Sequence, residues 1–131
     1  MLLTLLAGTV LMFVVVGIWF AVYYWLNPRL DNPDAKACIT GSCGDTMEIR
    51  LQFEKNKVVK TSHWTSGCAY SFNCVLAAAD IAKGKSPEEI LDIDADMIQK
   101  SVGGLPEDHI HCASLAAQTL HAAIDDYMKK T

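Results

Sequence analysis

The largest absence in this 131-residue chain is charge, since no Lys, Arg, Asp or Glu occurs between Met1 and Pro28. The apolar run from Leu2 to Leu26 exceeds the about 20 residues that a helix needs to cross the hydrocarbon core of a bilayer. The missing basic segment ahead of this run, and the lack of a clear small-x-small cleavage site after it, argue against a cleaved signal peptide. The sequence therefore predicts a retained transmembrane anchor over residues 1–28, with an aromatic belt at its C-terminal end formed by Trp19, Phe20, Tyr23, Tyr24 and Trp25.

Two further absences concern the rest of the chain. No face carries the clustered Lys and Arg that a nucleic-acid partner requires, so none is predicted. No Cys-x-x-Cys pair occurs, and the odd count of five cysteines suggests no disulfide framework, which favours reduced thiols in a cytosolic compartment. Arg29 and Lys36 follow the apolar run, so the positive-inside rule predicts a single-pass membrane protein with a cytoplasmic C-terminal domain.

The pattern after the anchor predicts strands first and helices afterwards. Residues 29–42, with their turn signals, are predicted to be a linker, and residues 43–131 a single domain. Alternation of apolar residues over 47–53, a turn at 55–57 and a second strand over 58–64 predict an antiparallel hairpin. Helices are predicted from Cys68 to the stop at Gly84, from a capping box at Ser86 and Glu89, and from Asp94 to Val102. The fold class is therefore α+β, a small antiparallel sheet packed against helices and preceded by one transmembrane helix.

Helical periodicity identifies the side chains that should face the core. In the helix after Cys68 the predicted inward residues are Phe72, Val75, Leu76, Ala79 and Ala82. In the long last helix they are Ala113, Ala116, Leu120, Ile124 and Tyr127.

What the sequence does contain is a set of metal ligands, on three segments: Cys43, Asp45, Cys68, His111 and Cys112. Thiolates and imidazoles are ligands that soft and borderline metals select, so the set indicates zinc or iron–sulfur chemistry. Cys68 and Cys112 fall at predicted helix N-termini, which should lower their thiol pKa values. Gly44 and Gly67 beside the ligands would let the backbone approach a bulky inorganic core.

Four short blocks and their spacing resemble the IscU/NifU family of iron–sulfur cluster assembly scaffolds over residues 41–129. These blocks are Ser42-Cys43-Gly44-Asp45, Thr65-Ser66-Gly67-Cys68, Gly103-Gly104-Leu105-Pro106 and Ile110-His111-Cys112. The resemblance implies thiolate ligation by the three cysteines, with Asp45 and His111 as the exchangeable partners that complete a [2Fe-2S] site. It also implies that Cys112 accepts sulfur from a cysteine desulfurase, that apo iron–sulfur proteins receive the cluster, and that the protein is not an enzyme.

Two departures from the family qualify the resemblance. The stretch Leu105-Pro106-Glu107-Asp108-His109 replaces the Leu-Pro-Pro-Val-Lys read by a dedicated Hsp70-type chaperone, which puts that partner in doubt. Bulky residues follow Cys68 where the family has small ones and serines, which could alter access to the cluster.

The hypothesis from the sequence is a membrane-anchored scaffold, with a mixed ligand shell in which Asp45 keeps the cluster labile. A zinc-bound sulfur acceptor that stimulates a desulfurase is the alternative, because the same ligands can hold zinc tetrahedrally. Cys74 is predicted to be a buried core residue, His63 to lie at a sheet edge and His121 to be solvated. The roles of Cys38 and His109 stay open.

Overall fold

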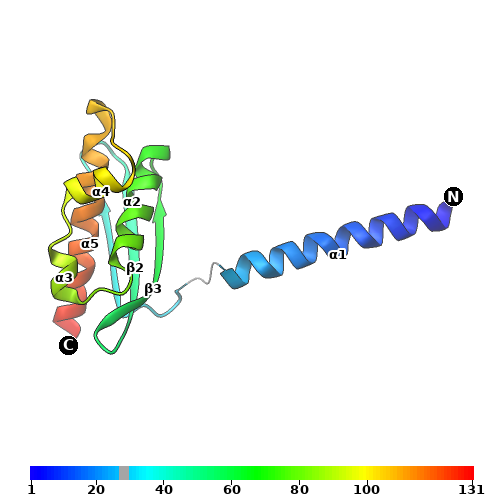
Figure 1. Ribbon diagram of the computed structural model, residues 1–131, viewed down its shortest axis with the longest axis horizontal. Helices are drawn as coiled ribbons and strands as arrows, with labels where there is room; N and C mark the ends of the chain where they lie inside the picture. Colours follow the sequence, from blue (N-terminus) through cyan, green and yellow to red (C-terminus); the bar gives the residue numbers. More distant parts are fainter. Residues whose placement is uncertain (27–29) are drawn as a thin grey trace.

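The computed structural model describes residues 1–26 and 30–131, and Figure 1 shows a long helix joined to a separate α+β domain. The helix α1 spans Leu2–Leu26 and buries none of its side chains. Within the described residues it is the one helix long and apolar enough to cross a membrane. The end of the predicted anchor, at 27–28, and Arg29 lie outside the described residues.

The sheet has three antiparallel strands in the order β1-β2-β3: β1 (Ala35–Thr40), β2 (Thr46–Glu54) and β3 (Lys57–Thr65). The expected alternation in the middle strand is confirmed, since Met47, Ile49 and Leu51 are fully buried against the helices. The prediction of a linker over 29–42 is wrong at residues 35–40, because β1 pairs with β2 from Ala35 opposite Leu51 to Thr40 opposite Thr46. Its small inward residues gave the strand too weak an apolar pattern to be recognised.

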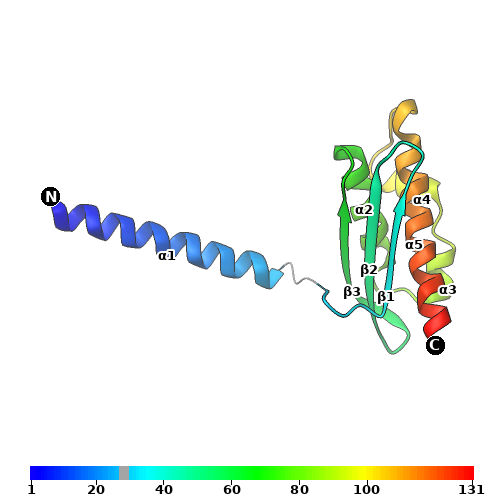
Figure 2. The ribbon, with the colours of Figure 1, turned by 180° about the vertical axis from the view of Figure 1, so that it is seen from behind.

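All helices of the domain cover one face of the sheet, and the strands lie in front of them in Figure 2. They are α2 (Ala69–Ala82), α3 (Pro87–Leu91), α4 (Ala95–Ser101), the short 3₁₀ helix η1 (Glu107–His109) and α5 (Ile110–Lys130). Both predicted caps are present: Ser86 and Glu89 form a reciprocal capping box on α3, and the Asp94 carboxylate accepts a hydrogen bond from the Met97 N–H.

The core-facing residues of α5 match the prediction, since Ala113, Ala116, Leu120 and Ile124 are buried. Tyr127 is partly buried and stacks on Phe53 of β2, with ring centroids 4.1 Å apart.

The predicted face of α2 is confirmed at Val75, Ala79 and Ala82, which are fully buried. The buried surface also includes Ser71, Cys74 and Ala78. The prediction is wrong for Phe72, which is 48% exposed and packs edge-on against His63 at the margin of the sheet. Burial of Cys74 confirms its assignment to the core. His121 is half-buried rather than solvated, because its Nε2 lies 2.8 Å from the Ile93 carbonyl oxygen.

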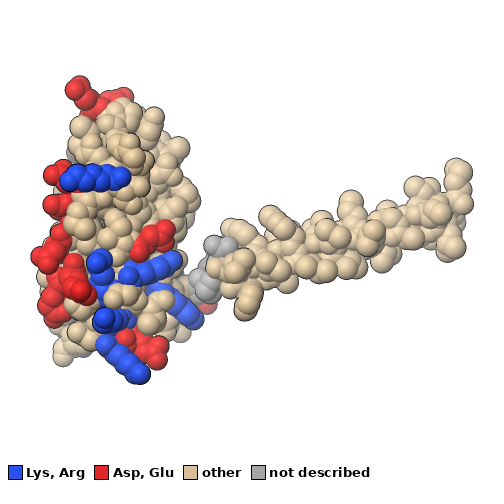
Figure 3. All heavy atoms as spheres, viewed as in Figure 1, with Lys and Arg blue, Asp and Glu red and all other residues tan. Residues whose placement is uncertain are grey.

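The topology places three connections at one end of the domain. In an antiparallel meander the β1–β2 turn and the last residues of β3 lie at the same end of the sheet. The pairing of Met47, at the start of β2, with Thr65, at the end of β3, shows this. The start of α5 reaches the same end (Figure 1), while the start of β1, the β2–β3 turn and the C-terminus lie at the other. In Figure 3 the basic side chains lie mainly over that second end, with acidic ones among them.

Candidate metal centre

The β1–β2 turn presents Cys43 and Asp45. The turn is closed by hydrogen bonds from the Gly41 N–H to the Asp45 carbonyl (2.8 Å) and from the Gly44 N–H to the Gly41 carbonyl (3.0 Å). Gly44 adopts a φ of +88°, a conformation that side chains rarely permit, with nothing within 4 Å of its missing Cβ. Cys43 is therefore held exposed at the tip of the turn, with Asp45 half-buried behind it.

Ser71, in the first turn of α2, links the ligands of all three segments. Its hydroxyl donates a hydrogen bond of 2.6 Å to Asp45 Oδ2. The same Oγ lies 3.4 Å from Cys112 Sγ and 3.8 Å from Cys68 Sγ. Ser71 is fully buried, so this hydroxyl is the polar centre around which the carboxylate and two of the thiols meet.

Gly67 makes room for this contact. A Cβ at this position would lie 2.6 Å from Asp45 Oδ2 and from both Cβ and Oγ of Ser71. Gly67 was predicted to let the backbone approach an inorganic core. The structure shows a more direct reason for a glycine at this position. Only a residue without a side chain lets the carboxylate and the serine approach each other across the β3–α2 connection.

The two thiols beside Ser71 differ in environment. Cys68 is exposed at the N-cap of α2, and the nearby Ser71 backbone N–H lowers its thiol pKa, as expected for a helix N-terminus. Cys112 lies in the first turn of α5 but is only 1% exposed, and burial raises its thiol pKa. The expected lowering at Cys112 is therefore wrong, because desolvation of the thiolate outweighs the polar contact with the Ser71 hydroxyl and the helix end.

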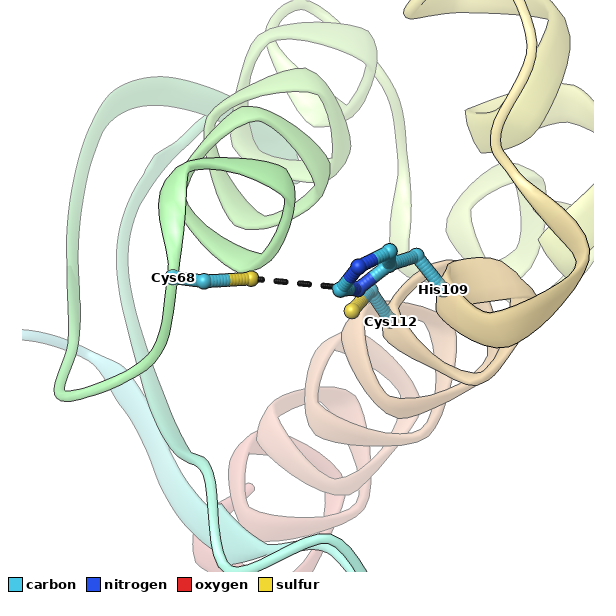
Figure 4. A group of neighbouring side chains, drawn as sticks. All are labelled: Cys68, His109 and Cys112. Carbon is cyan, nitrogen blue, oxygen red and sulfur yellow. Dashed lines mark hydrogen bonds between the residues drawn. The ribbon is translucent and has the colours of Figure 1, made fainter.

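His109, whose role the sequence left open, lies with these two thiols. The ligand atoms of Cys68, His109 and Cys112 all lie within 4.8 Å of one another, and Figure 4 shows the three side chains converging. His109 Nδ1 is 4.0 Å from Cys68 Sγ. The imidazole stacks on the ring of Tyr70, with centroids 4.3 Å apart.

His111 lies close to Cys112 and to His109, with the two imidazole centroids 6.2 Å apart. It is exposed, and its Nε2 is 3.7 Å from Cys112 Sγ. A small cavity of about 150 Å³ is lined by both Cys43 and His111, together with Gly41, Ser42, Ser114, Leu115 and Gln118. The five ligands predicted from the sequence thus gather at one end of the domain, in two adjoining groups.

Ser71 is the residue that sequence reasoning missed. A signal was available, since a serine three residues after a cysteine at a helix start lies on the same side of the first turn. In the sequence, the bulky residues of this segment drew attention away from the serine. One of them, Tyr70, stacks on His109 of the site.

Comparisons with known proteins agree with this arrangement. Residues 28–131 match the family described as NifU-like N terminal domain. The chain is 40% identical over 112 residues to the iron-sulfur cluster assembly scaffold protein IscU 1 of Archaeoglobus fulgidus, covering 82% of this chain and 73% of that protein. It is 32% identical over 114 residues to the scaffold protein IscU of Aquifex aeolicus, covering 82% and 73%.

The fold also matches solved structures. The crystal structure of a nitrogen-fixing NifU-like protein (N-terminal) from Brucella abortus superposes with a TM-score of 0.62 at 20% identity, covering 78% of this chain and 84% of that one. The helix α1 precedes the part of the chain that matches the family.

Proposed function

The chain belongs to the NifU-like N-terminal domain family, and on this premise we propose that it is a scaffold that assembles an iron–sulfur cluster and passes it to acceptor proteins. The observation that carries the proposal is the gathering of three cysteines, a carboxylate and two histidines at one end of a domain that is 40% identical to a named scaffold. A scaffold role involves no turnover of its own, so we propose that the protein is not an enzyme.

The donor set suits a cluster that is cargo. Thiolates bind iron–sulfur clusters strongly, whereas a carboxylate is a hard and weaker ligand. We propose Cys43, Cys68 and Cys112 as thiolate ligands of a [2Fe-2S] cluster, with Asp45 and His111 as the exchangeable ones. The Ser71 hydroxyl donates a hydrogen bond to Asp45 Oδ2, so it competes with the cluster for this carboxylate and favours release.

Sulfur would reach this site as the persulfide of a cysteine desulfurase. A protein thiolate attacks the outer persulfide sulfur, the S–S bond breaks, and the desulfurase cysteine leaves as a thiolate. The resemblance assigns this attack to Cys112, whose burial requires the site to open first. Mass spectrometry of persulfidated peptides in Cys68→Ser and Cys112→Ser variants tests the assignment. If Cys112 is the acceptor, persulfide should disappear from all remaining thiols in Cys112→Ser and should persist in Cys68→Ser.

Anaerobic reconstitution tests the scaffold function. The full chain in detergent micelles is supplied with iron, cysteine and a desulfurase, and visible absorbance is read together with metal content. We expect sulfide-to-iron charge-transfer bands, their loss on replacing Cys43, Cys68 or Cys112 by Ser, and transfer of the cluster to an apo-ferredoxin. Asp45→Ala should slow this transfer, and an unchanged rate would remove Asp45 from the release step.

A zinc-bound sulfur acceptor is the second candidate. It is favoured by one observation, the convergence of Cys68, His109 and Cys112 on a volume suited to a single ion. In the same experiment a colourless protein that retains one zinc and accelerates the desulfurase would select it.

We further propose that α1 anchors the domain to a membrane, with the domain on the cytoplasmic side. The support is the length and composition of α1 and the short connection that follows it. Leu30 is buried and its carbonyl accepts a hydrogen bond from Arg50 Nη1 (3.0 Å), so the chain is tied to the sheet four residues after Leu26. Four extended residues reach at most about 14 Å.

This short connection orients the site. The end that carries residue 30 and the β2–β3 turn would face the bilayer, and Lys55 and Lys57 in that turn would suit anionic headgroups. The metal centre lies at the opposite end of β2, roughly 25–30 Å away for a nine-residue strand. Partners would therefore reach the ligands from the aqueous side. Residues 1–26 should be needed for membrane association and dispensable for metal binding, as fractionation of a truncated chain would report.

A further inference from the structure

We propose that His109 is a metal ligand, and that with Cys68 and Cys112 it forms a mononuclear site for a borderline divalent ion such as zinc or ferrous iron. The inference deepens the proposed scaffold function, on which it rests in part, by naming the ligands that hold a metal ion before sulfide arrives. The resemblance implies His111 as the site imidazole and leaves His109 without a role.

The distances between the three donor atoms fit a tetrahedral site. In a tetrahedral site with Zn–S near 2.3 Å and Zn–N near 2.0–2.1 Å, ligand atoms lie about 3.5–3.8 Å apart. His109 Nδ1 is 4.0 Å from Cys68 Sγ, and no two ligand atoms of the group are further apart than 4.8 Å. Closing around an ion therefore needs side-chain shifts of about 1 Å or less, which rotation of an exposed Cys68 can supply.

His109 is already oriented by its neighbours. Tyr70 stacks on its imidazole at an interplanar angle of 28°, which holds the plane of the ring. The carboxylate of Asp108 lies 3.6 Å from Nε2, whereas it is the other ring nitrogen, Nδ1, that lies near Cys68. A carboxylate there favours the tautomer with the proton on Nε2, which leaves the Nδ1 lone pair facing Cys68.

His111 is not a member of this three-residue group. It is exposed and lines a cavity with Cys43, although its ring centroid lies 6.2 Å from that of His109 and its Nε2 lies 3.7 Å from Cys112 Sγ. Binding of one ion by Cys68, His109 and Cys112 leaves Cys43 and His111 available for the rest of the cluster. Three protein ligands also leave a fourth tetrahedral position for water or Asp45.

Cobalt(II) binding to the full chain in micelles, with sulfide absent, tests the site. We expect His109→Ala to weaken Co²⁺ binding at least tenfold and to reduce the ligand-field bands of tetrahedral cobalt, while thiolate-to-cobalt charge transfer persists. Paramagnetically shifted NMR should show an imidazole N–H resonance that disappears in His109→Ala. Tyr70→Ala should weaken binding several-fold, and the matched control Tyr70→Phe, which keeps the stacked ring, should retain wild-type affinity.

The outcomes are separable. Wild-type cobalt affinity and an unchanged N–H resonance in His109→Ala, with loss of both in His111→Ala, would overturn the assignment. Far-UV circular dichroism of each variant identifies any that fails to fold, and the Tyr70 pair then decides. Because no sulfide is used, a protein that binds cobalt through His109 yet builds no cluster would refute the scaffold proposal and leave this inference standing.

Discussion

Replacement of Gly67 by Ala should break the polar centre of the site and destabilise the domain. The added Cβ would lie 2.6 Å from Asp45 Oδ2 and from two atoms of Ser71, so these groups must move apart by about 0.8 Å to reach ordinary van der Waals distance. The carboxylate can rotate away, but Ser71 is buried in α2 and cannot. Overpacking of this kind costs about 1–3 kcal/mol, and loss of a hydrogen bond to a charged group about 1.5–3 kcal/mol. Because one movement relieves both, we expect the free energy of unfolding to fall by about 2–4 kcal/mol.

Residue-specific thiol labelling along a urea series measures this change. Cys74 is fully buried in α2, so its labelling reports unfolding of the helix that carries Ser71, in the full chain and without interference from the tryptophans of α1. The variant Ser71→Ala removes the hydrogen bond alone and should lower the free energy of unfolding by about 1.5–3 kcal/mol. In the double variant Gly67→Ala/Ser71→Ala, the loss in free energy of unfolding should be smaller than the sum of the two single losses by at least about 1 kcal/mol, since each substitution removes the same contact.

Gly44→Ala is the matched control. Its Cβ meets nothing within 4 Å, so its cost should come from the positive φ alone, about 1–2 kcal/mol, and should add to that of Ser71→Ala. A Gly67→Ala protein within about 0.5 kcal/mol of wild type, or one whose effect is additive with Ser71→Ala, would refute the steric reasoning.

Three further predictions follow from other contacts. Burial raises the pKa of Cys74 to about 11, above its unfolded value, so the folded state holds a proton that the unfolded state loses. The free energy of unfolding should therefore fall as pH rises from about 9 to 11, by at most about 1.4 kcal/mol per pH unit. In Cys74→Ala, the urea midpoint should no longer show this dependence on pH. Ser86→Ala removes the side chain that accepts from the Glu89 N–H and should cost about 1 kcal/mol in urea unfolding, against no change for the exposed Asn73→Ala. Tyr127→Ala should lower stability by about 3 kcal/mol through loss of the stack on Phe53, whereas Tyr127→Phe should retain it in the same assay.

Much of the domain was predictable because local signals agreed with the packing. The alternation through Met47, Ile49 and Leu51 and the capping box at Ser86 each report a local rule that the structure obeys. β1 was not predicted because alanine, cysteine and threonine give a short strand little contrast between its two faces. Only its pairing with β2 defines it as a strand. Phe72 was assigned to the core by helical periodicity, whereas its position at the edge of the sheet leaves it 48% exposed.

For the site, the sequence by itself determined the chemistry of the donors. Cysteine, aspartate and histidine at glycine-bounded turns and helix starts identify a metal ligand set and the family that uses one.

Only the tertiary structure decided how these donors are grouped. It placed a serine hydroxyl between Asp45 and the thiols, buried Cys112 while leaving Cys68 exposed, and brought the His109 imidazole together with those two thiols. Desolvation and three-dimensional distance depend on residues far apart in the chain. Ser71 and Cys112 stand 41 positions apart, yet their Oγ and Sγ atoms lie 3.4 Å from each other.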